Sequence, residues 1–413
     1  MDIPMEYHIA HELLLLFLRE EPARFSPVDI DRFLEANWNA VVQQANRHGV
    51  TSLLYQSLSA PQFELIVPAT ITQTLRIPYL EFFWQNTSLY NNLSNILKAL
   101  QQKNIPVTLL KGAHLAQTVY SNIALRPMGD IDILVKKEDL LQAKEHLLGL
   151  GYTPFKETDI ATASASCQHL SPMIKQDAPP VELHWTLESP TSPFTIDVEG
   201  LWQRARPASV GGVDTLTLSP EDLLLHLCLH TAAHHLYSNG LRALCDIRES
   251  IRHYREELDW KTVQLRAEEW GAGNAVYLTL YLARSLLGAD VPDTLLNRLQ
   301  PEEKTQQPIA AAQTFIFSGS ELDRHIAAAP HTRSLFASRS VLQTVVLLLQ
   351  RIFLPHETIA QLYNLPVDSP RIPLYYPVRL KDLLVRHTRT VWRIWRRDKA
   401  TVRQFELVDW LSH

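Results

Sequence analysis

The stretch Asp130-Ile131-Asp132-Ile133-Leu134-Val135 alternates acidic and aliphatic side chains before it ends in an aliphatic run. A period of two is typical of a β-strand with one polar and one buried face. Asp130 and Asp132 are therefore expected to project from the same face. Two carboxylates this close repel each other unless a cation lies between them, and Mg²⁺ prefers carboxylate oxygens. By itself, the pattern also fits the solvated edge of a sheet.

Other β-rich segments surround this stretch. Residues 181–187 (VELHWTL) alternate in the same way and place Glu182, His184 and Thr186 on one face. Residues 105–110, 152–155 and 213–218 are the remaining strand candidates, and a helix is expected over 137–148. Glu182 would thus supply a third carboxylate from a neighbouring strand, with His184 two residues further along the same face.

Helical periodicity dominates both ends of the chain. The longest amphipathic segment covers about residues 75–103, and Ser219-Pro220-Glu221-Asp222 has the hydroxyl cap, proline and acids of a helix start. We therefore predict an α+β fold. A small mixed β-sheet over 104–218 would be flanked by an N-terminal helical region, 1–103, and a C-terminal helical region, 219–413.

A lysine and a glycine, Lys111 and Gly112, lie between a predicted strand and a helix expected at 114–119. Backbone N–H groups near a helix start, with an ammonium group beside them, suit a phosphate. Arg126 lies four residues before Asp130. The alternatives are a solvated lysine and an arginine that forms a structural salt bridge to one of the acids.

Three histidines, His226, His230 and His234, repeat at intervals of four and would line one helical face. Such spacing can chelate zinc, but no matching cluster of cysteine and histidine supplies the other ligands, so zinc is not expected. The three cysteines lack C-x-x-C spacing. A reducing compartment fits them best.

Length and composition exclude several classes of protein. The 413 residues suggest two or three structural units, and 46% hydrophobic with 20% charged residues excludes a disordered chain. No apolar run reaches the roughly 18 residues of a membrane span. The first residues are acidic where a signal peptide would be basic, so a cytoplasmic location is expected.

The net charge of −5 conceals a basic segment near the C-terminus. Residues 379–403 hold nine Lys/Arg and two Asp/Glu, which leaves −12 on the rest of the chain. The segment is predicted to form an amphipathic helix. A surface that binds RNA, a nucleotide tail or anionic lipid is one interpretation, and a docking helix whose arginines are solvated or pair with the acidic body is the other.

Several of these segments together resemble a known family. Residues 109–152 (LLKGAHLAQTVYSNIALRPMGDIDILVKKEDLLQAKEHLLGLGY) are similar to the polymerase-β-type nucleotidyltransferase superfamily, and most closely to a bacterial branch of uncharacterised nucleotidyltransferases. Further landmarks are W-x6-A-x2-HGV at 38–50, VELHW at 181–185, the histidine-rich helix and LRALCDI at 241–247. The resemblance covers about residues 10–300.

The resemblance implies roles for several residues. It makes Asp130 and Asp132 the metal-binding acids, Glu182 the third carboxylate and Gly112 the glycine of the phosphate loop. The family usually has Gly-Ser in this loop, but Ala113 follows Gly112 here. Lys111 and Arg126 are the candidates to replace the missing hydroxyl as ligands of the triphosphate.

The resemblance also places three residues of the C-terminal region, His230, Arg242 and Asp246, beside the active cleft. There they would orient the acceptor or act as a base; a buried network that joins two helices is the alternative. His184 would contact phosphate or position Glu182.

The implied activity is transfer of NMP from an NTP, with ATP favoured, to a hydroxyl-bearing acceptor. It would depend on Mg²⁺, with Mn²⁺ as a second candidate, and Glu182 would help to deprotonate the acceptor. A small molecule or peptide natural product is the favoured acceptor, with a protein or tRNA as the alternative. The competing hypothesis is a catalytically degenerate module of the same fold that binds a nucleotide or a partner.

Overall fold

The computed structural model describes residues 5–19, 25–157, 159–302, 305–318, 359, 363, 366, 369–382 and 399–412 of the chain. Its central element is a seven-stranded mixed sheet in the order β3-β4-β5-β2-β1-β7-β6. The strands are β1 (Thr108–Leu109), β2 (Ile131–Leu134), β3 (Thr153–Pro154), β4 (Met173–Ile174), β5 (Val181–His184), β6 (Arg206–Val210) and β7 (Val213–Thr217).

The pairing of β2 with β5 creates the polar surface at the centre of the sheet. The two strands run parallel, with Asp132 opposite Glu182 and Leu134 opposite His184. β1 lies antiparallel to β2 on its other side and parallel to β7. The predicted α+β class with a mixed sheet is confirmed.

Helices from both ends of the chain enclose the sheet. The N-terminal ones are α1 (Met5–Arg19), α2 (Pro27–Leu34), α3 (Trp38–Arg47), α4 (Thr51–Leu58), η2 (Pro61–Phe63) and α5 (Ala69–Gln101). Among the strands lie α6 (Lys111–His114), η3 (Leu115–Val119), η4 (Ile123–Leu125), η5 (Lys137–Asp139), α7 (Leu140–Gly149), α8 (Ile160–Ser166) and α9 (Val198–Arg204). Then come α10 (Pro220–Leu229), η6 (His230–His234), α11 (Leu241–His253), α12 (Trp260–Glu269), α13 (Gly273–Leu287), α14 (Asp293–Leu299), α15 (Gln306–Ser318), η7 (Ile372–Leu374) and α21 (Lys399–Leu411).

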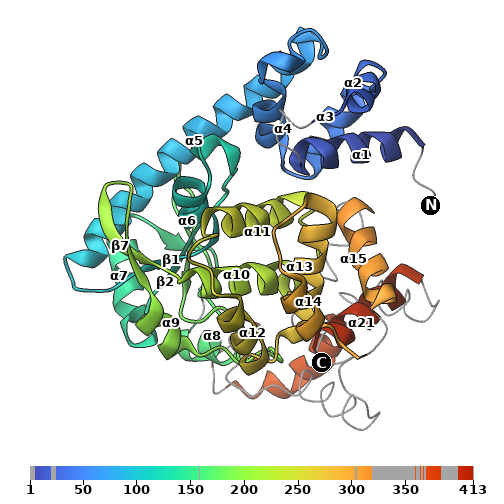
Figure 1. Cartoon of the computed structure of the whole chain (residues 1–413). Helices are drawn as coiled ribbons and strands as arrows, with labels where there is room; N and C mark the ends of the chain where they lie inside the picture. Colours follow the sequence, from blue (N-terminus) through green and yellow to red (C-terminus); the bar gives the residue numbers. More distant parts are fainter. Residues whose placement is uncertain are drawn as a thin grey trace.

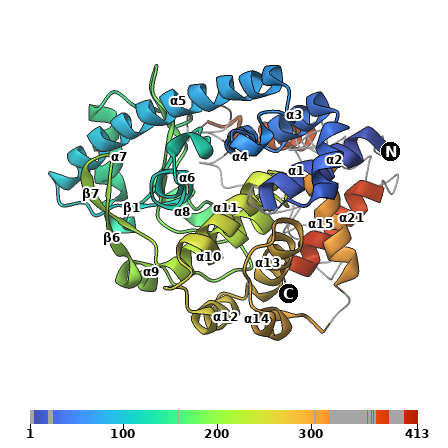
Figure 2. The same cartoon turned by 45° about the horizontal axis from the view of Figure 1, so that its top comes forward.

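Two large hydrophobic cores hold these elements together. In one, side chains of α1, α3 and α4 pack with those of α10, α11 and α13, so the two terminal regions share a single core. The other lies on the sheet and includes the second half of α5, from Leu89 to Leu100. Figures 1 and 2 both show α5 running from the N-terminal helices to the strands, so this helix joins the two cores.

The local predictions hold for the strongest patterns. Ser219 caps α10 by accepting the N–H of Asp222, and the long helix expected at 75–103 is α5. The strand expected at 105–110 is only two residues long. The β4 and β6 strands were not predicted; β6 contains Pro207, which an edge strand tolerates because one side of it forms no ladder.

Most of the basic segment cannot be compared with its prediction, because residues 383–398 lie outside the described residues. Within the part of the chain that the structure describes, no helix combines the length and apolarity that crossing a membrane requires.

Candidate active site

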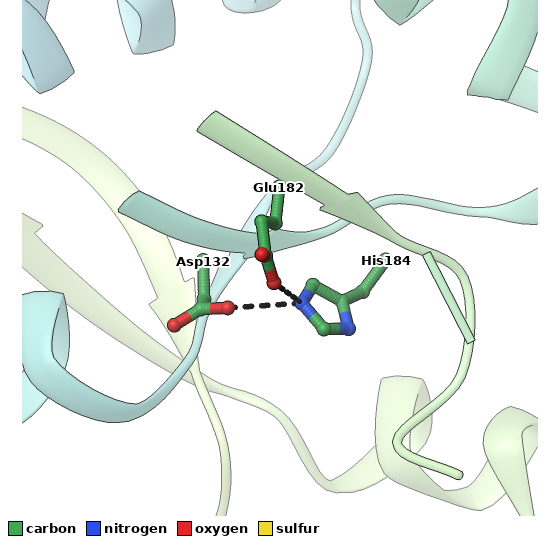
Figure 3. Close-up of side chains that lie close together, drawn as sticks. All are labelled: Asp132, Glu182 and His184. Carbon is green, nitrogen blue, oxygen red and sulfur yellow. Dashed lines mark hydrogen bonds and ion pairs between the residues drawn. The ribbon is translucent and has the colours of Figure 1, made fainter. Parts of the chain in front are cut away.

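Asp132, Glu182 and His184 converge on the surface of the paired strands (Figure 3). Nε2 of His184 lies 3.0 Å from Oδ1 of Asp132 and 3.4 Å from Oε2 of Glu182. One ligand atom from each of the three residues lies within 4.8 Å of the others, close enough to hold one metal ion. The convergence follows from the parallel register, which puts residues 132 and 182 side by side and brings residue 184 to the same face.

Lys111 also contacts this cluster. Its Nζ donates to Oδ1 of Asp132 over 2.9 Å, and both side chains are largely buried. Burial of Asp132 favours the neutral acid, but Lys111 and His184 outweigh it and hold the pKa of Asp132 well below its ordinary value. Burial likewise opposes the charged form of His184, and its bonds to Asp132 and Glu182 nevertheless raise the pKa of His184.

Asp130 lies apart from this group. It precedes β2 instead of belonging to it, is exposed, and is not one of the three convergent ligands. It does line the same cavity. Partial desolvation, followed by repulsion from Asp132 and Glu182, raises its pKa. Asp130 has no hydrogen-bond or ion-pair partner among the residues that the structure describes.

Arg126 and Asp246 form a network that joins the sheet region to α11. Nη2 of Arg126 lies 2.9 Å from Oδ2 of Asp246, and Nε donates to both carboxylate oxygens. Tyr120 donates its hydroxyl to the same carboxylate over 2.8 Å, and Nη1 of Arg126 donates to the Pro127 carbonyl. The structural salt bridge considered for Arg126 therefore exists, but with Asp246 instead of Asp130 or Asp132.

Gly112 lies in close contact with two side chains that a Cβ atom would have to displace slightly. A Cβ atom there would lie 3.0 Å from Cγ of Met128 and 3.1 Å from Nη1 of Arg126. Ala113 is buried, and its carbonyl accepts the hydroxyl of Tyr90 over 3.0 Å. The loop therefore approaches the Arg126 network closely.

A cavity of about 750 Å³ opens in front of the carboxylates. Most of its lining residues have polar or charged side chains, and Ala233 is the one lining residue with an aliphatic side chain. It collects residues from all three regions: Asn46, Arg47, His48, Gly49, Lys111, Asp130, Gln168, His169, Glu182, His184, Glu188, Ser189, Thr191, Ser192, His230, Ala233, His234, His235, Ser238, Asn239 and Arg242.

The histidine-rich segment forms one wall of this cavity. His234 Nε2 lies 2.7 Å from Oε1 of buried Glu188, and His230 lies 3.2 Å from His235 through their Nε2 atoms. Burial, followed by repulsion from Lys111, lowers the pKa of His230 well below its ordinary value. Among the described residues, His226, His230 and His234 are not part of a group that could hold a metal ion.

The loop after α3 forms another part of the cavity wall and packs against the start of α11. Gly49, at φ +66°, lies against Arg242, and a Cβ there would make an ordinary contact of 3.4 Å with Cδ of Arg242. Gly240, at φ +67°, lies against His48, where a Cβ would be 2.6 Å from Nδ1. Both backbone conformations favour glycine. The two loops are therefore interlocked at the edge of the cavity.

Some cavity residues were not identified from the sequence. His169 lies 3.7 Å from Glu182, and Glu188 supports His234, but neither belongs to a motif with recognisable spacing. Residues 48–50 were singled out in the sequence only as the HGV part of the family motif at 38–50. Nothing in its local pattern indicates which distant residues it contacts.

The mixed sheet and its convergent donor residues fit an enzyme that transfers phosphorus-containing groups, and the comparison with protein families shows this class. The family described as "Uncharacterised nucleotidyltransferase" matches residues 35–288, more than half of the chain, and the chain belongs to this family. It is thus a nucleotidyltransferase, an enzyme that transfers an NMP group. No curated protein and no solved structure matches the chain.

Proposed function

We propose that the enzyme transfers NMP from an NTP, with ATP favoured, to a hydroxyl group of a small polar molecule in a reaction that requires Mg²⁺. The observation that carries the proposal is the convergence of Asp132, Glu182 and His184 on two parallel strands at the cavity. An acceptor oxygen would form a bond to the α-phosphorus while the bond to the β-phosphate oxygen breaks. Pyrophosphate leaves with the electron pair of that bond.

The donor set fits a divalent metal. Two carboxylates suit Mg²⁺, and the imidazole nitrogen of His184 makes Mn²⁺ a second candidate. Asp132, Glu182 and His184 would hold the ion, and Asp130 would add a fourth ligand from the cavity edge. When bound, such an ion neutralises phosphate charge and activates the attacking hydroxyl.

The residues around the donor set would bind and orient the substrates. Lys111 is paired with Asp132 and also lines the cavity. Its ammonium group would turn from this carboxylate toward a phosphate oxygen of the substrate. Glu182 is the candidate for the proton of the acceptor hydroxyl. Gly112, which has no side chain, would let the phosphate approach the backbone of the loop. Arg126 contacts the loop and would hold it in place through its bonds to Asp246.

The polar lining favours a small molecule rich in hydroxyl or amino groups over an apolar peptide. The cavity wall offers hydrogen-bond donors and acceptors to such a molecule from Ser192, His230 and His234. His234 is oriented by Glu188, an arrangement that suits an imidazole which binds or deprotonates a hydroxyl.

Metal-dependent release of pyrophosphate tests the proposal. Purified enzyme is incubated with each NTP, Mg²⁺ and fractions of small polar metabolites, and pyrophosphate and nucleotidylated products are measured. Asp132→Asn is expected to lower the rate at least about 100-fold, since it removes a ligand charge. Equal rates for the wild type and Asp132→Asn would contradict the proposal and favour a degenerate binding module.

A further inference from the structure

The cations around the cavity differ in whether another side chain already neutralises them. Lys111 is paired with Asp132 and Arg126 with Asp246, each at 2.9 Å. Arg242 has no hydrogen-bond or ion-pair partner among the residues that the structure describes. Of these three candidates for an anionic substrate, Arg242 therefore keeps a free guanidinium group.

The surroundings of Arg242 make this free charge costly. The residue is half-buried in the cavity wall. Burial, followed by repulsion from Arg126, lowers the pKa of Arg242. Asp246 attracts it, but that carboxylate is already bound to Arg126. A partly desolvated guanidinium without a partner is expected where an anion binds, because its planar donors fit phosphate oxygens.

The backbone holds Arg242 at the cavity and adds positive potential of its own. The interlocked glycines Gly49 and Gly240 place the loop after α3 against the side chain and the start of α11. The N-cap of this 13-residue helix, Gly240, forms no side-chain capping bond. Ser238, Asn239 and Arg242, around the start of α11, line the cavity, so the partial positive charge of this helix N-terminus lies at the cavity edge.

A second uncompensated charge of opposite sign lies in the same cavity. Asp130 attracts Arg242 electrostatically, but the two do not form an ion pair. A cavity that keeps one free carboxylate and one free guanidinium is complementary to a divalent metal bound to a polyphosphate. The metal would neutralise the acid and the phosphate the arginine.

We propose that Arg242, assisted by the N-terminus of α11, binds the β- and γ-phosphates of the NTP and holds the pyrophosphate group as it leaves. The proposal rests on the function proposed above. It assigns the pyrophosphate site to the junction of the two helical regions, where Arg242 and the loop after α3 line the cavity.

Isothermal titration calorimetry with magnesium pyrophosphate tests the assignment without an acceptor. Arg242→Gln is expected to weaken binding about 10- to 100-fold, since it removes a charge-assisted pair of bonds. Arg242→Lys keeps the charge, so its affinity for magnesium pyrophosphate should lie between those of the wild type and Arg242→Gln. Arg255→Gln removes the same charge from an exposed residue that lies 3.4 Å from Asp290 and serves as the matched control. Circular dichroism and thermal unfolding verify the fold of each variant.

Equal affinities of the wild type and Arg242→Gln would overturn the proposal, and so would a wild type that does not bind pyrophosphate at millimolar concentration. Failure of the proposed function looks different. In that case pyrophosphate binds through Arg242, but no NTP releases pyrophosphate under any acceptor condition. Conversely, pyrophosphate release with unchanged binding by Arg242→Gln would retain the enzyme and reject the site.

Discussion

Lys111 donates to Asp132 over 2.9 Å from a backbone at φ +42°, a conformation that non-glycine residues rarely adopt. The residue with this backbone conformation starts α6, and its ammonium group contacts the carboxylate on the neighbouring strand. Because strain of this kind persists where the surroundings determine it, and often at functional sites, the pair is the first target for mutation.

Lys111→Met should destabilise the protein, because it leaves the buried carboxylate of Asp132 with His184 as its remaining partner. We expect a loss of about 1–3 kcal/mol in the free energy of unfolding, measured with urea. Mg²⁺ should restore stability more strongly in this variant than in the wild type. Lys137→Met, at an exposed lysine, is the control, and an equal effect of Mg²⁺ on all three proteins would contradict the interpretation.

Arg126 and Asp246 should behave as one buried unit. Arg126→Ala is expected to cost about 3–5 kcal/mol of stability, since it strands the carboxylate of Asp246 beside Tyr120. A double-mutant cycle with Asp246→Ala should show a coupling energy above about 1 kcal/mol. Additive effects of the two single changes would mean that the salt bridge contributes little.

Acidification should destabilise the protein well before its carboxylates titrate. Burial is the largest cause that lowers the pKa of His48 and His235 to about 3 and of His114 to about 4. Each is neutral in the folded protein, so its contribution is complete above the unfolded value near 6.5 and is lost as the pH falls toward the folded pKa.

His184 changes the stability with pH in the opposite direction, because its pKa is raised in the folded protein. Its contribution is present below about pH 6.5 and is lost as the pH rises through the folded value. The pKa values of His169, His226 and His230 are lowered as well, so the histidines with a lowered pKa outnumber His184, and the free energy of unfolding should decrease between pH 7 and pH 5. His114→Asn should reduce this slope by up to about 1.4 kcal/mol per pH unit. An unchanged slope in urea titrations at both pH values would refute the assignment.

Glu188 should affect the acceptor step more than nucleotide binding. Glu188→Gln keeps the shape of the side chain but removes the charge that orients His234 at 2.7 Å. We expect kcat for pyrophosphate release to fall about 10- to 100-fold, with the affinity for magnesium pyrophosphate unchanged. A parallel loss of both quantities would indicate a structural role instead.

Gly240 should tolerate alanine less well than a glycine that also has a positive φ but lies in open space. At Gly240, φ +67°, a Cβ would lie 2.6 Å from His48, whereas at Gly212, φ +74°, nothing lies within 4 Å. Gly212→Ala should therefore cost about 1–2 kcal/mol from backbone strain alone. Gly240→Ala should cost more and also weaken pyrophosphate binding. Similar unfolding free energies for the two variants would show that the contact with His48 is readily relieved.

Much of the candidate site follows from local sequence patterns. The period of two places Glu182 and His184 on one strand face, and Ser219 marks the start of α10, where the structure has it. Asp130 departs from its pattern because β2 begins at Ile131, so the strand geometry that the alternation implies does not extend to it. The short strands at β3 and β4 are too brief for periodicity to identify.

The sequence by itself determined the class of fold, the polar face of each central strand and the family, because these depend on local periodicity and on contiguous motifs. Only the tertiary structure decided which faces meet. The parallel register of β2 and β5 places Asp132 beside Glu182. The packing of α11 lets Asp246 form an ion pair with Arg126, while Arg242 has no such partner among the described residues. These partners are separated by 50 to 120 residues, and such pairing is decided by the packing of whole elements and not by any local pattern.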